Sequence, residues 1–394
     1  MSERAKSPDL YSEAFGDGLN TDQDQVKRID RFSEAKSCQV VLLDYIEQIE
    51  DLRKEYEVIF WCGRMLIFRL FLRSRTYRLI GGCSCKKHLL CCLCALRRAA
   101  RQSKEYEKKI RFLLAENPDW VPVLITRTVA NGVSLKERFN HFVKSHKKMM
   151  SNRRQSLSDS CGTVGFAANS VMRYVHGSAG SYEFKLGENS GLWHPHTHEI
   201  ALLDGSRFEF TEVERKDKIV RVPLEFESEL SKEWSRATGD SWIVDVRMLD
   251  INNEEGFRKG VCESFKYALK FSDLEPSDQV EAYRTLKGRR LIFSYGALWG
   301  VKVSDSVVDT IEDALELEPY VDVIYNFAFG KGKYRVSGLS DFGKIEKNKS
   351  GYNSNKVDDL FEIHFTDGSV INQETVDDFV AGRLKEEQDV EVPF

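Results

Sequence analysis

Three of the eight histidines lie at alternate positions in the segment GLWHPHTHEIALLD, as His194, His196 and His198. Side chains alternate between the two faces of a β-strand, so His196 and His198 would point the same way in an extended segment. Neutral imidazole is a good ligand for divalent metals. Pro195 suits the start of a strand and leaves open whether His194 belongs to it. We interpret His196 and His198 as a candidate metal pair; a stacked or surface pair is the alternative.

A carboxylate lies close enough in the sequence to join this pair. Residues 181–187 and 197–204 have the composition of two strands that flank the turn ENSG. If these strands form a hairpin, Glu183 could reach an ion bound by His196 and His198. Two imidazoles and one carboxylate leave coordination positions open, which suits a catalytic metal better than a structural one.

A second group of reactive side chains lies in CESFKYALK, within a helix that we expect over residues 261–271. The helical repeat places Glu263, Tyr267 and Lys270 on one face, with Lys266 within reach of Glu263. A phenol is a poor nucleophile at neutral pH unless a metal polarises the electrophile or nearby cations favour the phenolate. The alternative is an ordinary helix surface with a Glu–Lys pair and a half-buried tyrosine.

Five of the nine cysteines lie within twelve residues, as Cys83, Cys85, Cys91, Cys92 and Cys94. In a cytosolic chain such crowding suggests metal ligation before disulfides. Cys91 and Cys94 have the spacing of a zinc knuckle, and Cys83 or Cys85, with His88, could complete a tetrahedral set. The candidate ligands outnumber the four positions, so the set stays open. Buried reduced thiols are the alternative.

Charge is unevenly distributed along a chain whose formal net charge is −4. Residues 86–154 carry 17 Lys and Arg against 5 Asp and Glu, a net charge of +12. Residues 304–394 carry 9 against 20, a net charge of −11. The basic part suggests contact with a polyanion, although solvated helix faces would explain it equally well. Among the basic side chains, we expect those of the helix after the cysteines to contact DNA phosphates: Arg97, Arg98 and Arg101.

The composition, 41% hydrophobic and 30% charged over 394 residues, is that of a soluble globular protein with two or three domains. The polar first residues resemble no secretory signal. The most apolar segment, residues 58–72, contains Arg64 and Arg69, so we expect a buried helix there rather than a membrane span. Expected helices and strands are interspersed, which indicates an α+β fold. A cytoplasmic location is expected.

WHPHTH and ESFKYALK, about 70 residues apart, together resemble the HUH endonucleases. They look most like the single-tyrosine initiators of rolling-circle plasmid replication. That family has HPHxH on a central strand and a later E-x-x-K-Y-x-x-K on a helix. Weaker similarity in VLITRTVAN, SYEF, GDSWIVDVRML and LKGRRLIFSYGALWG extends it over roughly residues 80–300. One position departs: Thr197 stands where the family usually has a large apolar residue, which affects packing behind the strand rather than ligation.

The resemblance implies an HUH endonuclease domain over residues 113–303, with a central antiparallel sheet flanked by helices. Around it we expect an N-terminal tail with helices (1–75), a cysteine-rich, zinc-binding segment with a basic helix (76–112), and an acidic C-terminal α/β region (304–394). The implied partners are double-stranded and single-stranded origin DNA and, among host proteins, a helicase and a polymerase. No membrane partner is implied.

The resemblance also implies a role for each site residue. Tyr267 would attack a phosphodiester, form a 5′-phosphotyrosine bond and free a 3′-hydroxyl. His196 and His198, with Glu183, would hold Mg²⁺ or Mn²⁺ over the phosphate. Glu263 would activate a water for the closing cleavage, and Lys270 would stabilise charge on the tyrosine or phosphate.

Two alternatives remain open from the sequence. One is a related HUH enzyme, a single-strand transposase or a conjugative relaxase, with the same metal site. The other belongs to a different class: a zinc-containing DNA-binding regulator without catalytic activity, in which the histidines and the tyrosine are structural.

Overall fold

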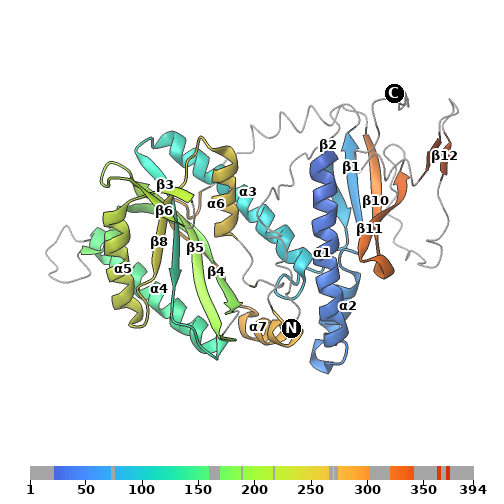
Figure 1. The fold of residues 1–394 in the computed structure, drawn as a ribbon, viewed down its shortest axis with the longest axis horizontal. Helices are drawn as coiled ribbons and strands as arrows, with labels where there is room; N and C mark the ends of the chain where they lie inside the picture. The colour runs from blue at the N-terminus through green and yellow to red at the C-terminus, as the bar shows by residue number, and fades with distance from the viewer. Residues whose placement is uncertain are drawn as a thin grey trace. The chain divides into compact units, whose positions relative to one another are not determined.

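The computed structural model of the chain is shown in Figure 1, which labels its helices and strands. Among the described helices, none combines the length and the apolar character needed to cross a membrane. The described residues form two compact units: unit 1 lies within Ala95–Val303, and unit 2 combines Gly16–Cys94 with Ser304–Phe394. The structure describes residues 22–71, 76–158, 169–187, 190–215, 218–265, 269, 274–301, 320–340, 362–364 and 370–372.

Unit 1 is built on a five-stranded antiparallel sheet with the strand order β8-β3-β5-β4-β9. The long central strands β4 and β5 form a hairpin, so their pairing sets the positions of most side chains in this unit. A separate two-stranded sheet joins β6 (Thr211–Arg215) to β7 (Lys218–Val222). The strands of the main sheet are β3 (Trp120–Thr128), β4 (Val175–Leu186), β5 (Trp193–Asp204), β8 (Val244–Met248) and β9 (Ile292–Gly296).

Helices cover both faces of this sheet (Figure 1). On one face, Ile110 of α3 and Phe257 of α6 pack against Ile200 of β5 in a fully buried cluster. On the other face, Phe142 of α4 contacts both Trp234 of α5 and a tyrosine of β4. The helices with residues in this unit are α3 (Cys92–Glu116), α4 (Leu135–Ser158), α5 (Leu224–Thr238), α6 (Glu254–Ser264) and α7 (Pro276–Leu286), with the 3-10 turn η3 (Val171–Tyr174).

The face under α4 and α5 contains buried polar groups. Arg127 and Glu199 are fully buried and form an ion pair of 2.7 Å, with the guanidinium 5.3 Å from the ring of Trp234. Thr197 is completely buried, and its cross-strand neighbours are Arg127 on β3 and Tyr182 on β4. The residue between the two histidines therefore faces away from them and into this polar layer.

Unit 2 contains a four-stranded antiparallel sheet with the order β11-β10-β1-β2. Its pairing joins distant parts of the chain, since Met65 of β1 lies opposite Asn326 of β10. Helix α1 packs against β11 and α2. The elements are α1 (Asp22–Ile46), η1 (Glu50–Leu52), α2 (Arg53–Trp61), β1 (Met65–Phe71), β2 (Thr76–Gly82), β10 (Tyr320–Ala328), η5 (Phe329–Lys331), β11 (Lys333–Ser340), and the paired β12 (Glu362–His364) and β13 (Val370–Asn372).

The α+β fold class with antiparallel sheets is confirmed, but two expected helices are wrong in extent. Residues 58–72 are not one buried helix, because α2 ends at Trp61, Gly63 turns the chain with φ of +67°, and β1 follows. Residues 261–271 are not one helix either. Helix α6 ends at Ser264, and Leu269 makes an isolated parallel bridge to Phe184 of β4.

Candidate metal centres

The register between β4 and β5 brings Glu183 and two histidines together. Glu183 is the cross-strand partner of His196, and His198 lies two residues further along β5, on the same face. The Glu183 Oε2 atom lies 3.1 Å from His196 Nε2 and 3.3 Å from His198 Nε2. We call these three residues the His–Glu group; their ligand atoms all lie within 4.8 Å of one another. Two imidazoles and a carboxylate at this spacing can hold a divalent cation.

The second nitrogen of each imidazole has a neighbour that orients the ring. His198 Nδ1 lies 3.0 Å from Oγ1 of Thr126 on β3, and His196 Nδ1 lies 3.4 Å from the backbone oxygen of His194. A neutral ring that donates from Nδ1 keeps the lone pair on Nε2. Contacts of this kind fix the orientation and the tautomer of metal-binding histidines. Both Nε2 atoms are thus aimed at Glu183.

The His–Glu group is largely buried and negatively charged at its centre. Burial alone would raise the pKa of Glu183, but His196 and His198 outweigh it and hold that pKa well below its usual value. A second carboxylate borders the group, because Glu263 Oε1 lies 3.5 Å from His198 Nε2. The side chain of Glu263 is 32% exposed, so solvent can reach it.

Helix α6 positions Glu263 in its last turn. Asn253 caps the start of the helix by accepting from the Gly256 amide at 2.9 Å. Phe257 and Val261 bury one side of the helix against the sheet. Ser181 of β4 donates its hydroxyl to the backbone oxygen of Ser264 at 3.0 Å, which ties the end of the helix to the strand that carries Glu183.

The chain after α6 returns to the same strand. Leu269 bridges Phe184, the residue next to Glu183. Tyr267 and Lys270 lie outside the described residues, as does Lys266, so the structure does not place these three side chains.

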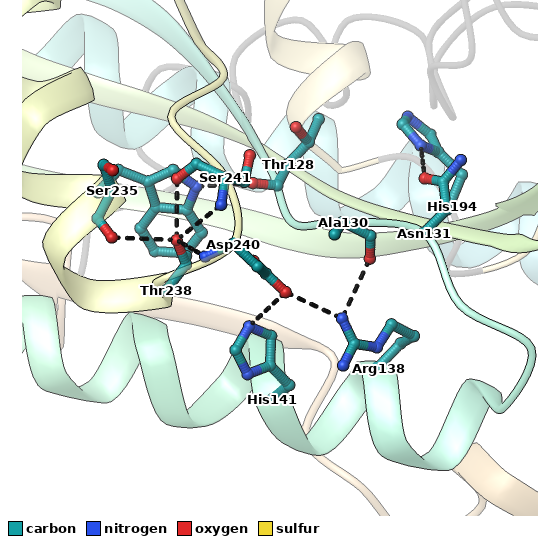
Figure 2. Close-up of polar contacts among 11 residues, drawn as sticks. Thr128, Ala130, Asn131, Arg138, His141, His194, Ser235, Thr238, Asp240 and Ser241 are labelled. Carbon is teal, nitrogen blue, oxygen red and sulfur yellow. Dashed lines mark hydrogen bonds and ion pairs between the residues drawn. The ribbon is translucent and has the colours of Figure 1, made fainter.

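His194 is not part of the His–Glu group, although β5 extends back through Pro195 to Trp193. Its Nδ1 atom lies 2.6 Å from Oδ1 of Asn131, in the loop after β3 (Figure 2). Burial, His196 and a nearby lysine lower the pKa of His194 to about 4. This imidazole is therefore neutral near pH 7 and is held by the loop.

Four cysteines of unit 2 form a second group that could hold a metal: Cys62, Cys85, Cys91 and Cys94. We call them the four-cysteine group. The Sγ atom of Cys94 lies 3.5 Å from those of Cys62 and Cys85, and the Sγ atoms of Cys91 and Cys62 are also 3.5 Å apart. A tetrahedral site with Zn–S bonds of about 2.3 Å has sulfur–sulfur edges of about 3.8 Å. The residues present therefore fit a structural zinc ion.

Backbone amides and a buried lysine surround the four-cysteine group. Backbone amides donate to two of the sulfurs, from Cys85 to Cys62 at 3.3 Å and from Cys94 to Cys91 at 3.5 Å. Hydrogen bonds from the other cysteines lower the pKa of Cys94, whereas burial raises the pKa of Cys91. Lys36 is fully buried and donates to the backbone oxygen of Cys62 at 2.6 Å, and burial lowers its pKa.

The structure changes the expected zinc ligands. Cys85, Cys91 and Cys94 were expected and come together, but Cys83 is exposed and neither it nor His88 belongs to the group among the described residues. Cys62 was missed because it lies far from the cluster in the sequence. The sequence feature that could have indicated Cys62 as a ligand is the glycine that follows it, Gly63. The positive φ of Gly63 allows a tight turn at which the carbonyl and the sulfur of Cys62 point inward. Any side chain at position 63 would also clash, because its Cβ would lie 2.1 Å from the side chain of Leu93.

The basic side chains expected to bind DNA lie on the first turns of α3 that belong to unit 1. Arg101 is exposed, and Arg97 and Arg98 are partly exposed. All three thus reach the surface of one helix.

Replacing His196 or His198 by Ala should weaken Mn²⁺ binding roughly 10-fold or more, because each change removes one ligand atom from the His–Glu group. Isothermal titration of zinc-loaded protein with Mn²⁺ measures this. The control is His194→Ala, which should leave the affinity nearly unchanged. A loss as large in His194→Ala would contradict the assignment of Glu183, His196 and His198 as the ligands.

Purified protein should contain one zinc ion per chain, and Cys62→Ser or Cys91→Ser should remove nearly all of it. Loss of the ion should also lower the melting temperature, since structural zinc stabilises the folded state. Elemental analysis and thermal denaturation measure these effects. Cys83→Ser is the matched control and should retain zinc; zinc loss in that variant alone would assign the site to other cysteines.

Comparison with known proteins identifies the family of the chain. No curated protein and no solved structure matches the chain. The family model Rep_1, described as replication protein, matches residues 76–323. That range is more than half of the chain and includes the whole His–Glu group. The chain belongs to this replication protein family.

Proposed function

We propose that the chain is a rolling-circle plasmid replication initiator that nicks and rejoins origin DNA through a 5′-phosphotyrosine intermediate. Membership of the replication protein family supports a role in plasmid replication and binding to origin DNA. The observation that carries the chemistry is the His–Glu group with Glu263 beside it. Such a constellation of two imidazoles and carboxylates suits metal-assisted phosphodiester chemistry.

Tyr267 is the proposed nucleophile. Its phenolic oxygen loses its proton and forms a bond to the phosphorus, the bond from phosphorus to the 3′-oxygen breaks, and the leaving 3′-oxygen takes up a proton to become the 3′-hydroxyl. One phosphodiester replaces another, so the bond energy is conserved for resealing. The structure supports this assignment through the residues on either side: Ser264 is tied to Ser181, and Leu269 bridges Phe184. Both anchors lie on the strand that carries Glu183.

His196, His198 and Glu183 would hold Mg²⁺ or Mn²⁺. When bound, the ion supplies Lewis-acid polarisation of the non-bridging oxygens of the scissile phosphate. The protein contributes the orientation, since both Nε2 atoms point at the charged Glu183 carboxylate. Lys270 would stabilise negative charge on the phenolate or phosphate.

Glu263 is the proposed base for the closing cleavage. Its carboxylate is partly exposed and borders His198, so it can accept a proton from a water that attacks the second phosphodiester. With a water as the second nucleophile, a single tyrosine suffices. The 3′-hydroxyl that a host polymerase extends, while a host helicase unwinds the duplex, comes from the earlier opening cleavage by Tyr267.

Two other functions compete with this proposal. A related HUH transposase or relaxase would share the metal ligands and the tyrosine, but the match to a replication protein family favours the initiator. A zinc-containing regulator that binds DNA without cutting it would keep the four-cysteine group and need no nucleophile. The regulator and the enzyme differ in whether a covalent protein–DNA adduct forms.

Incubation with Mn²⁺ and a labelled single-stranded origin oligonucleotide should give a covalent protein–DNA band with the wild-type chain. Tyr267→Phe should give none. Glu263→Ala should form the adduct and accumulate it, because the closing cleavage is impaired. Denaturing gel electrophoresis with a time course measures both effects. Tyr45→Phe, at an exposed tyrosine of α1, is the control and should behave like the wild type.

An adduct that survives Tyr267→Phe would assign the nucleophile elsewhere. If Glu263→Ala lost both cleavage steps equally, the role of this carboxylate would be structural rather than catalytic. A mobility shift without any adduct in the wild-type chain would support the regulator.

Replacing Arg97, Arg98 and Arg101 together by Gln should weaken binding to duplex origin DNA and flatten its salt dependence. Each lost phosphate contact reduces the slope of log affinity against log salt by about 0.9. Fluorescence anisotropy at several salt concentrations measures the slope. An unchanged slope would remove these side chains from the DNA interface.

A further inference from the structure

Two large apolar side chains are exposed side by side in unit 1, between α5 and β8. Trp242 is 68% exposed and Ile243 is 56% exposed. A large exposed aromatic ring next to a second exposed apolar residue offers surface whose burial against a ligand is favourable.

This pair lies next to the edge strand β8, at the same end of the strands as the His–Glu group. The amide of Thr128, the last residue of β3, donates to the backbone oxygen of Ile243 at 3.2 Å. Thr128 is in turn the cross-strand partner of His196, and His196 is the partner of Glu183. The backbones of Ile243 and His196 are therefore two strand spacings apart, roughly 10 Å at about 4.8 Å per spacing.

The backbone that carries Trp242 is held firmly. Thr238 donates its hydroxyl to the backbone oxygen of Ser241 at 2.8 Å and accepts from the Ser241 amide at 3.1 Å. Ser231 of α5 donates to the backbone oxygen of Trp242 at 2.5 Å, and Ser241 accepts from the Ile243 amide at 3.2 Å. A fixed loop presents an aromatic ring at little entropic cost to binding.

Arg138 connects this loop to the loop after β3, as Figure 2 shows. Its Nη1 atom donates to Asp240 at 3.0 Å and to the backbone oxygen of Ala130 at 3.3 Å, and His141 lies 3.0 Å from the same Asp240 carboxylate. The second loop carries Val133, which is 82% exposed. One guanidinium thus braces two loops that both display apolar side chains at this end of the strands.

The helix that supplies Arg138 is strongly basic. Helix α4 contains seven Lys and Arg residues and a single acidic residue, Glu137. Lys136, Lys144 and Lys148 are exposed on it. Positive charge beside exposed aromatic and apolar surface is the combination that binds single-stranded nucleic acid, in which bases stack on rings and phosphates meet cations.

We propose that Trp242, with Ile243 beside it, is a stacking site for an unpaired base of single-stranded DNA close to the scissile phosphate. The inference rests on the proposed function for the identity of the DNA as origin sequence. Stacking on Trp242 requires an unpaired base, so the site selects melted over duplex DNA. It fixes the strand a short distance from the His–Glu group and so positions the cleaved phosphodiester.

The test is the affinity for a short labelled single-stranded oligonucleotide, measured by fluorescence anisotropy in EDTA, where metal-dependent cleavage cannot occur. Trp242→Ala should weaken binding roughly 5- to 150-fold, the range for loss of one base stacked on an aromatic ring. Trp242→Phe should retain most of the affinity. The slope of log affinity against log salt should stay unchanged, because stacking releases no counterions.

The matched control is Trp299→Ala. Trp299 is 67% exposed in the same unit but follows β9, whose Gly296 pairs with Gly177 at the opposite end of β4 from Glu183. Its loss should change the affinity less than about two-fold. Thermal denaturation of both variants shows whether each is folded. If Trp242→Ala is unfolded, the affinities of Trp242→Phe and Trp242→His are compared instead. Trp242→Phe is then expected to bind the oligonucleotide more tightly.

Several outcomes would overturn the inference. These are unchanged affinity in folded Trp242→Ala, an equal loss in Trp299→Ala, or an equal loss for duplex DNA. A change of oligomeric state in Trp242→Ala with unchanged DNA affinity would instead make this surface a protein contact. Because binding is read without metal, a failure of the covalent-adduct assay leaves this test intact, and the two proposals fail separately.

Discussion

The pairing register of β4 and β5 is the constraint on which the candidate active site depends. Side chains alternate along a strand, so a slip of one residue would turn Glu183 away from both histidines. The opposite face of the same strands opposes such a slip. On that face Tyr182 of β4 is buried, and its hydroxyl lies 2.7 Å from Nδ1 of His146 on α4, a contact that the slip would break. The polar layer under α4 and α5 thus helps to specify the geometry of the metal ligands on the other side.

The two metal groups differ in the way their donors are arranged. The four-cysteine group offers four sulfurs at tetrahedral spacing, which leaves no position for a substrate. The His–Glu group offers two nitrogens and one carboxylate, with a partly exposed second carboxylate at its border. A closed set of soft donors suits stability, and an open set of harder donors suits chemistry on phosphate. The two kinds of donor set therefore lie in different units of the chain.

Local patterns predicted much of this structure. The alternating histidines, the β-branched run before Thr128 and the amphipathic α3 and α4 all form the expected elements, because strand and helix periods are visible in short windows. Glu183 could be matched to His196 because a short turn joins their strands.

The failures have physical causes that a short window cannot contain. The apolar run before Phe71 fits a buried helix as well as a strand, and its pairing with β2 and with the distant β10 makes it a strand. Cys62 joins the four-cysteine group through tertiary structure alone. Helix α6 ends at Ser264 although its pattern continues, since Phe265 packs against Tyr106 and Leu269 reaches a strand. The distance from Tyr267 to the histidines depends on the chain between these two anchors, which short-range patterns do not determine.

The partnership of β1 with β10 has a consequence for synthesis on the ribosome. Every strand of unit 1 is made before β10 emerges, so that sheet can close while translation continues. Strands β1 and β2 must instead wait, with one edge unpaired, until the last quarter of the chain arrives. Early termination in that last quarter would therefore release a chain with a complete unit 1 and an exposed, aggregation-prone hairpin.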